Sequence, residues 1–264
     1  MKTILLATSL SDNSAWAADY ALELAKKLGA DLTIVHAYDP DPAGGLAYES
    51  VDVTAMRHLS RLRTRMMKST KGSVTISVVA RPGEPETVIE TEIAAQNADL
   101  LIMGLAGEDP QKARTQGSLA RKLIPRTRVP MLLVPLGAHY QTVQTIVLAV
   151  DLSSPVDTLA LASAKRFAQL FGATLNIICM ENEPNEPLHK AAEGICNLLS
   201  DLPHTFSFLP GNDLALVLDD YADSHQADLI MLLPKPHNRL ESLLMESVTQ
   251  QVVRQARVPV LATV

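Results

Sequence analysis

The chain has little of the material that several classes of protein require. Its 264 residues include only two cysteines, Cys179 and Cys196, which cannot form a disulfide framework and which favour a reduced compartment. No apolar run approaches the roughly 20 residues that a membrane span needs. The apolar segment after Lys2 has about five residues, fewer than the roughly 7–15 of a signal-peptide core. We therefore expect a cytoplasmic protein with no membrane partner.

Basic residues are not in excess either. The chain has 23 Lys and Arg against 29 Asp and Glu, and its net charge of -6 argues against a nucleic-acid partner. One predicted helix carries Arg57, Arg61, Arg65 and Lys68 on one face, which could meet an acidic partner or RNA. The acidic net charge favours a solvated helix face instead. The histidines lack the spacing of a metal site, so we expect no metal ligands.

The second half of the chain repeats the first. Three pairs of segments show this: Ala98-Asp-Leu with Ala227-Asp-Leu, Arg128-Val-Pro with Arg257-Val-Pro, and Leu28-Gly-Ala with Phe171-Gly-Ala. The spacing between the copies shrinks along the chain, so the second unit is the shorter one. We infer two tandem units, 1–138 and 139–264.

Each unit alternates between short apolar runs and helical patterns. In the first unit we predict strands at 2–8, 31–37, 73–80, 99–103 and 130–134, and helices at about 11–28, 50–70, 85–97 and 118–125. Ser11 or Asp12 can cap the first helix, and Gly29 can end it. This order predicts an α/β unit with a five-stranded parallel sheet and helices on both faces. Ligands of such sheets bind at the carboxyl ends of the strands.

A glycine-rich loop follows the fourth predicted strand. Gly104, Gly107 and Gly117 precede Ser118 at the start of a predicted helix. Glycine lets backbone N–H groups approach a ligand, and a helix N-terminus presents further N–H groups, so the loop suits a phosphate. It is neither a Walker A loop nor a Rossmann fingerprint, because the spacing differs from both.

The spacing Gly-x2-Gly-x9-Gly-Ser after Met103 resembles the nucleotide-binding motif of the universal stress protein family. Val35-His36-Ala37 and Pro130-Met-Leu-Leu-Val are similar to the ends of two other strands of that family. The resemblance covers nearly the whole chain and implies two tandem flavodoxin-like domains, of the adenine nucleotide alpha hydrolase-like type. It also implies a bound adenine nucleotide, ATP or AMP, with or without Mg²⁺.

The resemblance assigns roles to particular positions. Phosphate and ribose contacts of the family fall on Gly104, Gly107, Gly117, Ser118 and Leu119. Four further residues belong to the same expected site: Met103 just before the loop, Ala37 where the backbone reads the adenine, and Thr8 and Ser9 at the end of the first strand.

Each unit departs from the family pattern in a different place. Ser9 stands where the family has Asp, so any contact that it makes to a nucleotide is weaker or passes through water. The second unit keeps the acid as Asp151, but its loop reads Leu233-Pro234-Lys235-Pro236-His237. Two prolines remove two backbone donors, so we expect no triphosphate there, while a monophosphate beside Lys235 stays open. The second unit is then a remnant.

These observations favour a non-enzymatic stress-response protein that binds an adenine nucleotide in its first unit and acts on an unknown protein partner. Nothing forms a nucleophile–base–orienter set, and Glu108 and Asp109 read as solvent-exposed loop acids. An interaction scaffold without nucleotide, a weak ATPase and an adenylate-transferring enzyme are the alternatives. By resemblance, the two units would pair as an intrachain pseudo-dimer, and a homodimer is open.

Overall fold

The computed structural model describes residues 1–11, 14–40, 48–105, 119–153, 155–233, 251–252 and 255–263. The chain divides into two compact units, Met1–Tyr140 and Gln141–Val264, and each is described by itself. Within the described ranges, no helix is long and apolar enough to cross a membrane.

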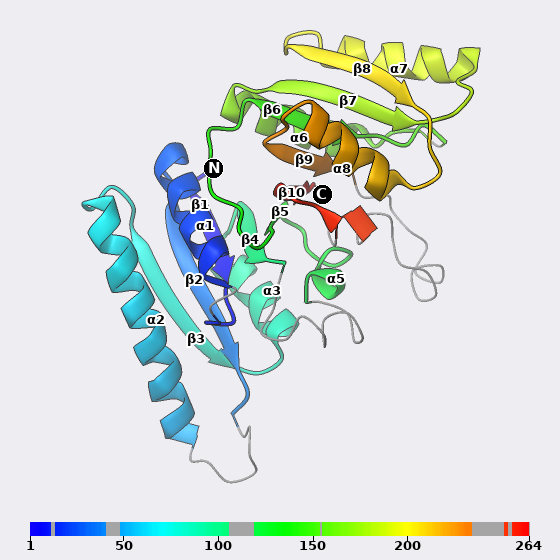
Figure 1. Ribbon diagram of the computed structural model, residues 1–264. Coiled ribbons are helices and arrows are strands. Elements are labelled where there is room, and N and C mark those ends of the chain that lie inside the picture. The colour runs from blue at the N-terminus through cyan, green and yellow to red at the C-terminus, as the bar shows by residue number, and fades with distance from the viewer. Residues whose placement is uncertain are drawn as a thin grey trace. The chain divides into compact units, whose positions relative to one another are not determined.

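The first unit alternates strands and helices (Figure 1). Its elements are β1 (Thr3–Ala7), α1 (Ala15–Leu28), β2 (Asp31–Tyr38), α2 (Tyr48–Thr70), β3 (Ile76–Pro82), α3 (Pro85–Ala95), β4 (Leu100–Gly104), α5 (Leu119–Leu123) and β5 (Met131–Val134). The strands lie in the order β3-β2-β1-β4-β5, and the neighbours within this unit are parallel. The predicted elements are confirmed, with ends that differ by a few residues.

The strand order reverses beside β1. The chain steps outward from β1 to β3, then returns across β1 to β4. Because crossovers between parallel strands are right-handed, the two directions place their helices on opposite faces of the sheet. α1 accordingly packs against α2, and α3 packs against α5. The carboxyl ends of β1 and β4 are therefore the point at which the connecting loops diverge.

The second unit repeats this topology. Its elements are β6 (Thr145–Ala149), α6 (Thr158–Phe171), β7 (Thr174–Met180), α7 (Glu186–Leu198), β8 (His204–Leu209), α8 (Leu214–Ser224), β9 (Leu229–Leu232) and β10 (Val260–Ala262). The order β10-β9-β6-β7-β8 is that of the first unit, and its neighbours are parallel. Both units have the predicted flavodoxin-like α/β fold.

The central strands are buried because helices cover both faces of each sheet. Ile4, Leu5 and Leu6 of β1 are fully buried, as are Ile146 and Leu148 of β6. Burial of both faces explains why these strands read as continuous apolar runs instead of alternating with polar residues. At roughly 25 cal/mol per Å² of apolar surface, such residues supply most of the stability of each unit.

The predicted C-terminal end of the first helix is confirmed, and the predicted N-cap is wrong. Gly29 closes α1 in the left-handed conformation with φ of 60°, as predicted, and Gly172 closes α6 in the same way with φ of 70°. The N-cap is Ser14, not Ser11 or Asp12. The helix starts later than predicted because the chain after β1 first forms a hydrogen-bonded loop that includes Ser11.

The aspartate of the repeated Ala-Asp-Leu segment has the same structural role in both units. The Asp228 carboxylate accepts hydrogen bonds from the backbone N–H groups of Gln144 and Thr145, at 2.8 and 3.0 Å. Asp99 does the same for Lys2 and Thr3 in the first unit, at 2.5 and 3.0 Å. In each unit one carboxylate therefore fixes where the central strand begins beside its neighbour, β4 or β9.

We expect Asp228→Ala to destabilise the second unit by about 1–2 kcal/mol, because two backbone donors lose a charged acceptor. Urea unfolding followed by circular dichroism measures the change. Asp220→Ala, an exposed aspartate of α8, is the matched control and is expected to change stability by less than about 0.5 kcal/mol. Equal losses in both variants would contradict this role of Asp228.

Candidate functional site

Five of the predicted site residues lie at one edge of the first sheet. Ala7 at the end of β1 pairs with Met103 of β4, so Thr8 and Ser9 follow β1 beside Gly104 at the end of β4. On the other side of β1, Ala37 lies two residues beyond Val35, which pairs with Ala7. The carboxyl ends of three neighbouring strands thus bring these residues to the point where the strand order reverses.

The side chains at this edge leave room around Gly104. Met103 is buried, whereas Ser9, Ala37 and Gly104 are half-buried. Gly104 pairs with Val134 of β5, and the next N–H, of Leu105, donates to the Val134 carbonyl at 2.9 Å. The sheet therefore continues to the first glycine of the predicted loop, where the backbone is half-buried.

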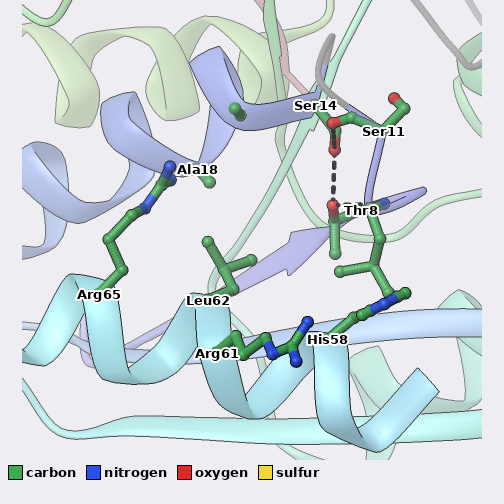
Figure 2. Close-up of a pocket in the computed structure, with 10 residues that line it drawn as sticks. Thr8, Ser11, Ser14, Ala18, His58, Arg61, Leu62 and Arg65 are labelled. Carbon is green, nitrogen blue, oxygen red and sulfur yellow. Dashed lines mark hydrogen bonds between the residues drawn. The ribbon is translucent and has the colours of Figure 1, made fainter. Parts of the chain in front are cut away.

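Thr8 holds the loop after β1. Its hydroxyl donates to Ser14 Oγ at 2.9 Å and accepts from the Leu10 N–H at 3.0 Å. Ser14 Oγ in turn donates to the Ser11 carbonyl at 2.7 Å (Figure 2). Leu10 has a φ of 64°, a left-handed conformation that is unfavourable for leucine, and the bond to Thr8 compensates for it. Thr8 is thus a positioning residue, buried at 7% exposure.

His36 braces the same loop from β2. Its Nδ1 donates to the Thr8 carbonyl at 2.9 Å, which fixes the proton on that nitrogen. The Thr8 N–H donates to the Val35 carbonyl at 3.0 Å. These two bonds give the histidine at the end of a buried strand a structural role.

Ser9 makes a different contact from the acid that it replaces. Its hydroxyl bonds to the Ser11 hydroxyl at 2.9 Å. At the equivalent place in the second unit, Asp151 is exposed and its carboxylate accepts from the Ser153 N–H at 2.8 Å. Two bonded hydroxyls keep one O–H free to donate, whereas a carboxylate only accepts. The two units therefore offer different chemistry at this position.

Leu119 is half-buried at the start of α5, which two ion pairs attach to α3. Lys122 contacts Glu86 at 2.8 Å, and Arg126, just after α5, contacts Glu90 at 2.8 Å. The hydrogen bond from Lys122 lowers the pKa of Glu86, so this pair is fully charged at neutral pH. The helix that follows the glycine loop is thereby held in place.

The remaining residues of the predicted site lie outside the described residues. They are Gly107, Gly117 and Ser118 in the first unit, and the segment after Leu233 in the second. The phosphate cradle and the degenerate second loop therefore stay predictions.

In the second unit, less polar residues take the places of Thr8 and His36 at the equivalent sheet edge. Val150 takes the place of Thr8, and its N–H keeps the equivalent bond to the Ile178 carbonyl at 2.9 Å. Cys179 takes the place of His36 and is buried, which raises the pKa of its thiol. The hydroxyl of Thr8 and the imidazole of His36, which hold the loop in the first unit, thus have no counterpart at Val150 and Cys179.

A hollow of about 300 Å³ lies between α1 and α2 on the far side of the Thr8 loop (Figure 2). Its polar walls are the loop hydroxyls of Ser11 and Ser14 and three basic side chains of α2, those of His58, Arg61 and Arg65. Sequence reasoning favoured a solvated face for these cations and missed the hollow. The signal was the four-residue spacing of Arg57, Arg61 and Arg65, which places them on one side of the helix.

The fold and the position of the candidate site at the carboxyl ends of the strands define an α/β protein of the doubly wound class. Ligands of this class bind where the strand order reverses. The model of the universal stress protein family matches residues 1–135 and 211–263. The chain belongs to this family.

Individual relatives agree with this assignment. A universal stress protein of Thermus aquaticus is 32% identical over 135 residues, which are 50% of this chain and 98% of the relative. One of Synechocystis sp. is 24% identical across 99% of both chains. A solved universal stress protein of Archaeoglobus fulgidus shares the fold with a TM-score of 0.76 at 18% identity, and the match covers 99% of this chain and 95% of that one.

We expect Thr8→Val to lower the free energy of unfolding by about 1–3 kcal/mol, because the Leu10 N–H loses its acceptor while the shape is kept. Val150 occupies the equivalent buried position in the second unit, so the position accepts valine sterically. Thr8→Ser keeps the hydroxyl and is the control, to be compared by thermal and urea unfolding. A valine variant as stable as the serine variant would contradict the role of the hydroxyl.

Proposed function

We propose that this universal stress protein is a non-enzymatic regulator that binds one adenine nucleotide, ATP or AMP, at the edge of its first unit. The observation that supports this most is the meeting of Thr8, Ser9, Ala37, Met103 and Gly104 at the reversal of the strand order. The family's nucleotide contacts were assigned to these residues from the sequence. The fold brings them to one edge although they are up to 96 positions apart.

The chemistry of this edge suits a nucleotide better than a metal or a reaction. Among the described residues, no group of His, Cys, Asp and Glu could hold a metal ion by itself. The half-buried backbone around Ala37 and Gly104 can meet a base and a phosphate, because neither residue has a side chain beyond Cβ to block the approach. Bound nucleotide would then bias the binding of a protein partner.

The second unit is the better candidate for a pairing or regulatory role than for a nucleotide site. Its edge carries Val150 and Cys179 in place of the polar pair, and its sequence has prolines where the first unit has glycines. We propose that it serves as a degenerate copy, in an intrachain pseudo-dimer within the cytoplasm. Light scattering on the purified protein distinguishes a monomer from a homodimer.

We expect heat or acid to release one adenine nucleotide per chain from freshly purified protein, as identified by mass spectrometry. Calorimetric titration of emptied protein with ATP, ADP and AMP should give a single site that Gly117→Val with Ser118→Ala abolishes. Asp151→Ala, at the equivalent edge of the second unit, is the matched control and should leave binding unchanged. No released ligand and no heat at millimolar nucleotide would leave the interaction scaffold as the function, and steady release of ADP would identify a weak ATPase.

Ser9→Asp restores the acid that the family has at this position. We expect it to tighten nucleotide binding about tenfold, because a charged acceptor forms hydrogen bonds about twice as strong as a neutral one. The loop tolerates the change, since Asp151 occupies the equivalent position in the second unit. Ser9→Asn separates size from charge and should bind as weakly as the natural protein. Weaker binding by the Asp variant would mean that Ser9 faces a phosphate, which would contradict the proposed orientation of the nucleotide.

A further inference from the structure

We propose that the hollow between α1 and α2 is a second anion site, which takes the phosphate groups of a small phosphorylated molecule. It adjoins the candidate nucleotide site, because its lining includes Thr8, the first residue after β1, and from there it extends between α1 and α2 on one face of the sheet. The two sites share the loop of Thr8, Ser11 and Ser14 as a wall. This inference does not depend on the proposed nucleotide.

Of the three basic side chains of the hollow, one is paired with a carboxylate and two have no ion pair within the described part of the chain. Arg65 donates to Asp19 of α1 at 3.0 Å, and this pair links the two helices. Arg61 and His58 form no ion pair with any described residue, and the described lining contains no carboxylate. Arginine suits phosphate because its planar group donates two parallel hydrogen bonds.

The hollow has one neutral hydroxyl donor opposite the arginine, on Ser11. When the Ser9 O–H is the donor in its hydrogen bond with Ser11, the Ser11 O–H remains to donate to a ligand in the hollow. The first turn of α1, at Ala15 and Ala18, forms part of the wall and carries no acidic residue. Figure 2 shows Arg65 and Leu62 rising from α2 toward α1, with the Thr8 loop at the end of the same space. A phosphate between Arg61 and Ser11 would meet donors from both sides.

A second hollow continues the positive surface along α2. It has a volume of about 450 Å³ and is lined by Arg57, Ser60, Arg61, Thr64, Arg65 and Lys68. Arginines four residues apart on a helix repel one another and destabilise it unless anions lie nearby. The stripe therefore extends the site for a ligand with more than one phosphate group. The first hollow, closed by two helices and a loop, favours a small molecule over a flat macromolecular surface.

The test uses inorganic pyrophosphate as the probe and the full chain with Gly117→Val and Ser118→Ala, which disable the candidate nucleotide site. Calorimetry at constant ionic strength should give one site, and adding Arg61→Gln should weaken it about tenfold or more. Arg63→Gln removes the same charge from the same helix outside both hollows, and it should change affinity less than about twofold. Pyrophosphate should also shift the amide resonances of Ser11, Ser14 and Ala15.

Three results would overturn the proposal. Absence of pyrophosphate binding up to millimolar concentration would show that the hollow holds no anion. Equal weakening by Arg61→Gln and Arg63→Gln would show diffuse charge attraction instead of a site. Pyrophosphate binding by the natural chain that disappears in the Gly117→Val, Ser118→Ala protein would place the anion at the glycine loop, which would support the nucleotide proposal while overturning this one.

Discussion

Parallel pairing of the strands around β1 is the constraint on which the rest of this structure depends. Parallel neighbours need long crossovers, and the crossovers cover both faces of the sheet with helices. The carboxyl ends of all these strands then lie at the same edge. The loops that follow β1 and its two neighbours, β2 and β4, are next to each other there. An edge of this kind brings Thr8, Ala37 and Gly104 together although they are far apart in the sequence.

The two units show how one backbone supports different chemistry at this edge. The N–H of Thr8 and that of Val150 make the same bond to the neighbouring strand, so the backbone is equivalent. The first unit has Thr8 and His36 beside this bond, and the second has Val150 and Cys179 in their places. The side chains can differ in this way because the register depends on main-chain bonds and on one carboxylate per unit, Asp99 or Asp228.

The positions of several candidate-site residues at the ends of strands could be predicted, because strand ends depend on short stretches of sequence. Met103 and Gly104 end an apolar strand and begin a glycine pattern, and Ser9 occupies the place of an acid, so both could be assigned from the order of residues. The contact of His36 with the Thr8 carbonyl could not, because it joins two strands through a side chain that points along the edge. The Ser14 cap was missed because the hydrogen bond from the Ser14 hydroxyl to the Ser11 carbonyl precedes the first turn of the helix.

The sequence by itself determined the class of the fold, the doubling of the unit and the place of the candidate nucleotide site. Apolar runs and Gly29 act over a few residues, where propensity is local, and the repeated segments are visible in the order of residues. Only the tertiary structure decided which groups the arginines of α2 lie beside. Their spacing shows that they share a face of the helix, but the rotation of α2 against α1 places Arg61 beside the Thr8 loop and Arg65 against Asp19. That rotation follows from packing of both helices on the sheet, which no single segment encodes.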